Sequence, residues 1–213
     1  MQFVVLIGAS GSGKTTIARA IAQRYADDVE VFHFDRIGVP SARRMITKYG
    51  SGEEWQRAKT IEWMAKLAPR SRSGRRLLFE GQTRLCFLAE GAEAAGGPAY
   101  LPILVDCDDE TRSRRLSLAR EQPELANEEM MHWARYLRCE AEGSGCEVLD
   151  TSALSLGRCI SHVMARLRGN PSSDKMPYDR KLIPTHRPDA PPLRGDGLDR
   201  LFPARQRRRR QAG

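Results

Sequence analysis

Short apolar runs alternate with longer amphipathic stretches along the first 169 residues of the chain. The short runs have the length and composition of buried strands, and they occupy residues 3–7, 31–34, 77–79, 100–105 and 147–149. Between them, apolar positions three to four residues apart predict helices at residues 14–25, 41–49, 53–67, 110–120, 128–140 and 156–167. The alternation predicts an α/β fold whose five-stranded parallel sheet is covered by helices on both faces. Because ligands of such sheets bind beyond the carboxyl ends of the strands, the residues there are the candidates for function.

The C-terminal part of the chain has a different composition. Residues 170–213 contain seven of the twelve prolines and show no helical or alternating apolar pattern. We therefore expect one domain over residues 1–169 and a Pro/Arg-rich disordered tail over residues 170–213. The tail carries 11 lysines and arginines against 5 aspartates, whereas residues 1–169 carry 24 against 22 acidic residues. Most of the net charge of +8 is therefore in the tail, and the domain is close to neutral.

Composition narrows the classes of partner. No window approaches the ~18 uncharged apolar residues of a membrane span, so we expect a cytoplasmic protein without a membrane partner. The five cysteines are scattered and never spaced as C-x-x-C, which argues against a disulfide framework or a zinc site. The arginine run at residues 207–210 leaves contact with nucleic acid as an alternative. We favour a solvated basic terminus, and the sequence does not indicate an oligomeric state.

A glycine-rich stretch directly follows the first predicted strand. Its sequence, GASGSGKTT, matches the pattern G-x-x-x-x-G-K-[ST] in full. Such a loop turns successive backbone N–H groups around a phosphate, and the helix that follows adds the positive end of its dipole. Lys14 is then placed to reach the β- and γ-phosphate oxygens, and the hydroxyl of Thr15 is placed to ligate Mg²⁺. The predicted nucleotide-binding residues of this loop are Gly8, Ala9, Ser10, Gly11, Ser12, Gly13, Lys14, Thr15 and Thr16.

Two other interpretations of this stretch are less consistent with its residues. A glycine turn without a ligand needs neither the lysine nor the threonine. A dinucleotide-binding fingerprint needs glycine or alanine where the chain has Thr16, although Asp35 lies near the offset of the ribose-binding acid. We therefore expect ATP and Mg²⁺ as cofactors.

Further motifs follow the predicted strands in a familiar order. The stretches GASGSGKTT, FHFDRIGVPS, LLFEGQTR, LVDCDDETRSRRLSLAR and VLDTSALS resemble those of the nucleoside-monophosphate-kinase-like group, which includes shikimate, gluconate and adenylylsulfate kinases. The resemblance spans about residues 1–168, and only the first motif is specific by itself. It implies a three-layer α/β/α P-loop NTPase fold, an acceptor-binding flap over residues 36–76 and a short lid region over residues 112–142.

The resemblance also implies roles for individual residues. Asp35, after the second strand, would face the acceptor hydroxyl as general base or positioning group and act on Mg²⁺ through its water shell; the alternative is a cap of the next turn. The implied catalytic residues are Lys14, Asp35, Arg115 and Arg120. Arg112, Thr151 and Ser152 would join the loop in binding the nucleotide. The acceptor would contact Asp35, Arg36, Glu80, Gln82 and Arg84.

Two of these residues have a second interpretation. Glu80 is alternatively an acid of the Walker B type beside the magnesium, and Arg84 is alternatively a surface residue of a helix. Which lid arginine contacts which part of the nucleotide is left open.

The predicted function is transfer of the γ-phosphoryl group of ATP to a hydroxyl of a small molecule, with Mg²⁺. A GTPase would show the motif N-K-x-D, which the sequence lacks. Motor and AAA+ ATPases usually carry a strand ending in an acidic pair and a further helical domain, and the sequence shows neither. Two alternatives remain: a polynucleotide 5′-hydroxyl kinase, which would give the basic tail a purpose, and a nucleotide-hydrolysing regulatory switch.

Overall fold

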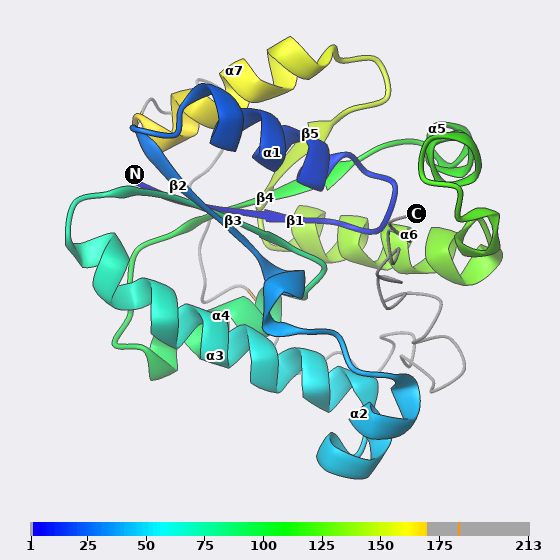
Figure 1. Ribbon diagram of the computed structural model, residues 1–213, viewed down its shortest axis with the longest axis horizontal. Helices are drawn as coiled ribbons and strands as arrows, with labels where there is room; N and C mark the ends of the chain where they lie inside the picture. Colours follow the sequence, from blue (N-terminus) through cyan, green and yellow to red (C-terminus); the bar gives the residue numbers. More distant parts are fainter. Residues whose placement is uncertain (1, 170–182, 184–213) are drawn as a thin grey trace, which may run out of the picture.

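The computed structural model describes residues 2–169 and residue 183 (Figure 1). One parallel sheet contains β1 (Phe3–Ile7), β2 (Val29–His33), β3 (Arg76–Gly81), β4 (Leu101–Asp106) and β5 (Glu147–Asp150). The α-helices are α1 (Lys14–Arg24), α2 (Ala42–Tyr49), α3 (Gly52–Arg72), α4 (Leu85–Ala94), α5 (Asp109–Arg114), α6 (Glu128–Gly143) and α7 (Leu156–Leu167). Short 3₁₀ turns occupy Phe34–Ile37 and Pro123–Leu125, and a π turn occupies Arg115–Ala119.

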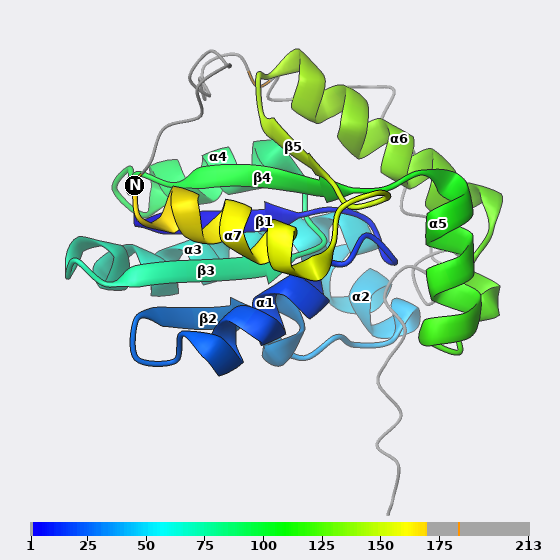
Figure 2. The same ribbon diagram turned by 90° about the horizontal axis from the view of Figure 1, so that it is seen from above.

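The strands lie in the order β2-β3-β1-β4-β5, and Figure 2 shows them side by side from above. The chain therefore first builds the sheet on one side of β1 and then on the other. At such a reversal the connections that leave neighbouring strands diverge, and a crevice opens beyond the carboxyl ends of the strands. The glycine-rich loop that follows β1 lies at this crevice.

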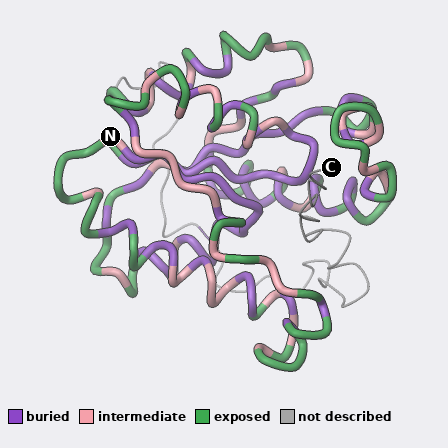
Figure 3. The backbone as a smooth tube through the Cα atoms, viewed as in Figure 1, coloured by how far each residue is buried: buried purple, intermediate pink, exposed green. Residues whose placement is uncertain are grey.

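The sheet is buried on both faces, as its central strand demonstrates. All five residues of β1 are buried. Val4 and Leu6 belong to the core formed with α1 and α7, whereas Phe3, Val5 and Ile7 belong to the core formed with α3, α4 and α6. Figure 1 shows these two groups of helices on opposite sides of the sheet. Figure 3 shows the central strands as buried, whereas the edge strand β2 is mostly half-buried. The predicted three-layer α/β/α fold is confirmed.

The predicted elements are found with shifted ends and one omission. Helix α4 was not predicted; its sequence, LCFLAEGAEA, is apolar over most of its length and has no clear helical period. Gly91 in this helix lets α4 pack closely on α3: a Cβ at Gly91 would lie 3.1 Å from the Cα of Ile61. The predicted helix over residues 110–120 is divided into α5 and the π turn.

The predicted disordered tail lies outside the described residues apart from Ile183, which is 7% exposed and belongs to the core beside α3, α4 and α6. None of the helices within residues 2–169 is long and apolar enough to cross a bilayer.

The turn after β2 is held in place by aromatic packing. Phe34 is buried against Trp55, with ring centroids 5.7 Å apart and the rings nearly perpendicular. The indole Nε1 of Trp63 donates a hydrogen bond to the carbonyl oxygen of Phe34 at 3.2 Å. Gly81 at the end of β3 makes room for this packing, because a Cβ there would lie 2.6 Å from the Cβ of Phe34. The position of Asp35, the next residue, is thereby fixed at the end of the sheet.

Candidate active site

The glycine-rich loop joins β1 to α1 and contains three glycines with positive φ, of which Gly8 has a φ of +150°. Gly11 has a φ of +80° and Gly13 a φ of +96°, conformations that glycine adopts without steric cost. Gly8 passes so close to β4 that a Cβ would lie 2.2 Å from the carbonyl oxygen of Val105. The loop is thus a tight turn that ends on the positive end of α1, the geometry of an anion-binding site.

Lys14 is the first residue of α1 and is buried, with 8% of its surface exposed. Its Nζ donates a hydrogen bond to the carbonyl oxygen of Ala9 at 3.1 Å. No ion pair between described residues includes Lys14. Burial is the main cause that lowers the pKa of Lys14; Glu80 opposes it, the charge of Arg120 adds to it, and together they bring the pKa to about 8. Lys14 is therefore a buried cation that no described acid pairs with, which favours the binding of an anionic ligand.

Glu80 lies on β3, directly beside the loop. It is 5% exposed and accepts hydrogen bonds from the Thr15 hydroxyl at 3.0 Å and from the Nδ1 of His33 at 2.7 Å. Burial acts to raise the pKa of this carboxyl, but the His33 hydrogen bond and the Lys14 charge outweigh it, so the pKa lies below its usual value. Of the two interpretations of Glu80, this contact with Thr15 favours the acid of the Walker B type.

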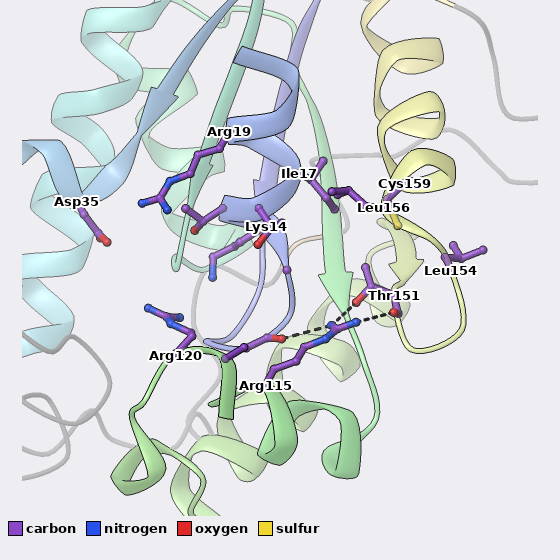
Figure 4. A pocket seen from close by; sticks show the side chains of 15 residues that line it. Lys14, Ile17, Arg19, Asp35, Arg115, Arg120, Thr151, Leu154, Leu156 and Cys159 are labelled. Carbon is purple, nitrogen blue, oxygen red and sulfur yellow. Dashed lines mark hydrogen bonds between the residues drawn. The ribbon is translucent and has the colours of Figure 1, made fainter. Parts of the chain in front are cut away.

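A cavity of about 490 Å³ extends from the loop, a size typical of small-ligand sites. Its lining includes Lys14, Asp35, Arg115, Arg120 and Thr151 (Figure 4). The exposed Asp35 points into the cavity from one side, and the exposed Arg120 points into it from the other. The cavity thus brings together the four predicted catalytic residues, which come from three separate parts of the chain.

Arg115 is directed toward a different part of the cavity from Arg120. Its guanidinium donates hydrogen bonds to the Oγ1 and the carbonyl oxygen of Thr151, both at 2.8 Å. Thr151 Oγ1 in turn donates to the carbonyl oxygen of Ser12 at 2.9 Å. Arg115 therefore connects the π turn, the phosphate loop and the loop after β5, whereas Arg120 acts electrostatically on Lys14.

Arg112 does not line the cavity. Its side chain is fully buried behind the loop, where it forms an ion pair with Asp106 and donates to the carbonyl oxygens of Ser10 at 2.9 Å and Cys107 at 3.1 Å. This geometry supports the loop and does not place the guanidinium where a nucleotide would contact it. Ser152 also lies outside the lining, and its hydroxyl accepts a hydrogen bond from the Asp108 N–H at 2.9 Å.

The remaining predicted acceptor residues differ in exposure. Gln82 is buried and accepts a hydrogen bond from Ser10 Oγ at 3.3 Å. Arg84 is 3% exposed and pairs with Glu53 at 2.6 Å, so its interpretation as a surface residue was wrong. Its guanidinium also lies 5.3 to 5.5 Å from three aromatic ring centroids. Arg36 is exposed and does not line the cavity.

Two residues of this region were not predicted as functional. His33 ends β2, and its register partner across the sheet is Glu80. Asp106 ends β4 and pairs with Arg112 behind the loop. An acid at the end of a strand was the signal that identified Asp35 and Glu80, and the same signal applies to Asp106. No comparable signal marks His33, because its partner is identified only by strand pairing.

The donor set fits a magnesium ion that arrives with a nucleotide. Within residues 2–169, no group of three or more His, Cys, Asp or Glu side chains is arranged to hold a metal ion. Mg²⁺ is typically bound by one or two protein oxygens together with phosphate oxygens and water. The hydroxyl of Thr15, beside the carboxylate of Glu80, offers such a protein oxygen.

This site has the loop, the lysine and the strand order of a P-loop protein. Comparison with known families decides to which P-loop family the chain belongs. A family model described as an AAA domain matches residues 4–141, well over half of the chain. The chain belongs to this AAA domain family. The lack of a strand that ends in an acidic pair therefore does not set the chain outside the AAA domains. No curated protein sequence matches the chain.

Solved structures show the same fold as this AAA domain at low sequence identity. Shikimate kinase from Acinetobacter baumannii in complex with shikimate has a TM-score of 0.55 and 16% identity, with 80% of this chain and 94% of that chain covered. A sugar kinase from Janibacter sp. has a TM-score of 0.56 and 20% identity, with 79% of this chain and 95% of that chain covered. A gluconokinase from Sinorhizobium meliloti has a TM-score of 0.53 and 18% identity, with 78% of this chain and 91% of that chain covered. The resemblance of the sequence motifs to small P-loop kinases thus extends to the fold.

Proposed function

We propose that the chain transfers the γ-phosphoryl group of ATP to a hydroxyl group of a small molecule, with Mg²⁺. The observation that carries the proposal is the shared cavity of Lys14, Arg120 and Asp35. Two cations converge there with one exposed carboxylate opposite them. Phosphoryl transfer needs cations around the moving phosphoryl group and a carboxylate that orients the attacking oxygen. The shikimate kinase, sugar kinase and gluconokinase of similar fold support the same reaction class.

The proposed chemistry assigns one task to each group. The loop N–H groups and Lys14 bind the phosphate chain, and Arg120 compensates the charge on the γ-phosphoryl oxygens. Asp35 accepts the hydrogen of the acceptor hydroxyl, whose oxygen forms a bond to the γ-phosphorus. The bond from that phosphorus to the β-γ bridging oxygen breaks, and ADP leaves with the bonding electrons. Thr15, supported by Glu80, would hold Mg²⁺, which when bound neutralises charge on the β- and γ-phosphate oxygens.

The flap surface favours an acceptor that carries negative charge. Between residues 36 and 50 the chain has four basic residues and no acid. Three of them, Arg43, Arg44 and Lys48, line one hollow of about 540 Å³ beside α2 with Tyr49 and Lys59. Phosphate and carboxylate groups are the ligands that such a surface attracts. The positive charge would also suit a polynucleotide 5′-hydroxyl kinase, the second candidate function, so the assay below includes oligonucleotides.

The decisive assay measures ADP release from ATP with sugars, sugar phosphates, cyclitols, nucleosides and 5′-hydroxyl oligonucleotides as acceptors. We expect one class to stimulate ADP release. We expect Asp35→Asn to lower the stimulated rate by about 10²- to 10⁴-fold, the usual contribution of a general base, without loss of ATP binding. Asp27→Asn removes the same charge from the exposed turn before β2 and should leave the rate unchanged.

Two results would contradict the proposal. Full stimulated activity of Asp35→Asn would exclude Asp35 as base or positioning group. ADP release that is indifferent to every acceptor would favour a nucleotide-hydrolysing switch.

A further inference from the structure

The carboxylate of Glu80 is close enough to Lys14 to affect it, yet it does not pair with it. Glu80 is the strongest influence that raises the pKa of Lys14, whereas no ion pair between described residues joins the two side chains. The reason lies in the other contacts of the carboxylate. Its Oε1 is 2.7 Å from the Nδ1 of His33, and its Oε2 is 3.0 Å from the hydroxyl of Thr15. Each oxygen is thus engaged away from Lys14.

His33 is well placed to hold this orientation. It is the last residue of β2, and strand pairing sets it opposite Glu80 in the neighbouring strand. The two side chains are 16% and 7% exposed. Because an ionised carboxylate only accepts hydrogen bonds, Nδ1 of His33 carries the hydrogen and donates it. A row of contacts therefore runs from β2 through Glu80 to Thr15 of the phosphate loop.

Loss of the imidazole would change the surroundings of the carboxylate. Oε1 of Glu80 would then be a buried acceptor without its partner, which is costly for a charged group. The nearby buried cation is Lys14, so the carboxylate would gain by turning toward it. That rotation would remove the acceptor from the Thr15 hydroxyl and neutralise the lysine on which the phosphates depend.

We propose that His33 is a positioning residue that holds Glu80 on Thr15 and away from Lys14. In this way it keeps the ammonium of Lys14 available for nucleotide phosphates and the Thr15 hydroxyl oriented for the metal that accompanies them. The inference rests on the proposed function only for the identity of the ligand, a Mg²⁺-nucleotide. His33 itself contacts neither the nucleotide nor the acceptor in this assignment.

The test is calorimetric titration of the full chain with ADP, with and without Mg²⁺, and it needs no acceptor. His33→Leu removes the donor, and we expect it to weaken ADP binding by about 10-fold or more, since the lost hydrogen bond is one to a charged carboxylate. We also expect it to reduce the gain in affinity that Mg²⁺ gives. His33→Asn retains an N–H donor near the place of Nδ1 and should bind ADP within about threefold of the wild type.

A matched control and a background variant separate positioning from packing. The Nε2 of His162 lies 2.6 Å from the Oε1 of Glu147, a similar pair away from the cavity, so His162→Leu should not change ADP affinity. In a Glu80→Gln background, His33→Leu should have no further effect, because the imidazole acts through that carboxylate. Thermal melts check that each variant is folded.

Unchanged ADP affinity in His33→Leu would overturn the proposal. Equal losses in His33→Leu and His33→Asn would also overturn it, since packing and not the donor would then matter. Because ADP binding needs no transfer, neither result depends on whether an acceptor is found.

Discussion

The charge of Lys14, which is buried and forms no ion pair with another described residue, leads to a prediction about stability. Replacing this lysine by methionine keeps a side chain of similar length but removes the ammonium from its buried site. In the folded protein burial lowers the pKa of Lys14 from 10.5 to about 8, with Arg120 adding to the effect. The folded state therefore disfavours the charged form, and without a nucleotide we expect Lys14→Met to be more stable than the wild type at pH 7.

The magnitude and the sign follow from the two pKa values. A difference of one pKa unit corresponds to about 1.36 kcal/mol, so the charge of Lys14 costs the free protein about 3 kcal/mol. Between pH 8 and 10.5 the unfolded chain binds more protons at this lysine than the folded chain, so wild-type stability rises with pH. The cost is fully present below pH 8 and is relieved as the pH approaches 10.5. The advantage of Lys14→Met should shrink over the same interval.

Urea unfolding of both proteins without nucleotide, at pH 7 and at pH 10, measures this difference. We expect a higher midpoint for Lys14→Met at pH 7 and a smaller difference at pH 10, with loss of nucleotide binding. A Lys14→Met protein that is less stable at pH 7, or a difference that does not change with pH, would refute the reasoning. Arg24→Met, on the exposed end of α1, is the matched control and should show no such pH dependence.

Two other substitutions test how the loop and the turn are supported. Arg112→Met removes the buried cation that pairs with Asp106, while Arg138 still lies 3.4 Å from the other carboxylate oxygen. Urea unfolding should therefore show a loss of about 3 kcal/mol, much of which Arg112→Met/Asp106→Leu should restore. Wild-type stability in Arg112→Met would contradict this support. Gly81→Ala introduces a Cβ 2.6 Å from that of Phe34, so it should destabilise the fold by about 1–3 kcal/mol and lower acceptor-stimulated turnover more than ADP affinity. Equal stability and turnover would show that the turn tolerates displacement.

The sequence was sufficient for the fold because its local signals agree. Buried β1 reads as a continuous apolar run, and the loop after it matches a specific pattern. Helix α4 was missed because it packs through a glycine and has apolar residues on most of its surface, so no 3.6-residue period is visible. The position of α4 depends on its packing against α3, and the sequence of α4 alone does not indicate that contact.

The candidate site was predictable where a residue follows a strand and much less so elsewhere. Asp35 and Glu80 were found because the carboxyl ends of parallel strands meet at one edge. The arginines of the lid were not distinguishable from the sequence, since a charge on a helix does not indicate its partner. In the fold, Arg112 is buried against Asp106, Arg115 bonds to Thr151, and Arg120 is exposed in the cavity. Such assignments depend on contacts between segments far apart in the chain.

The proposed function requires that the γ-phosphoryl group moves to a hydroxyl group and not to water. Its most direct test incubates the protein with Mg²⁺ and ATP radiolabelled in the γ-phosphate, with each acceptor class in turn, and separates the labelled products. Transfer to a hydroxyl group predicts label in a phosphate ester of one acceptor class, and no such ester with Asp35→Asn. Label found only in inorganic phosphate, whatever acceptor is present, would contradict it.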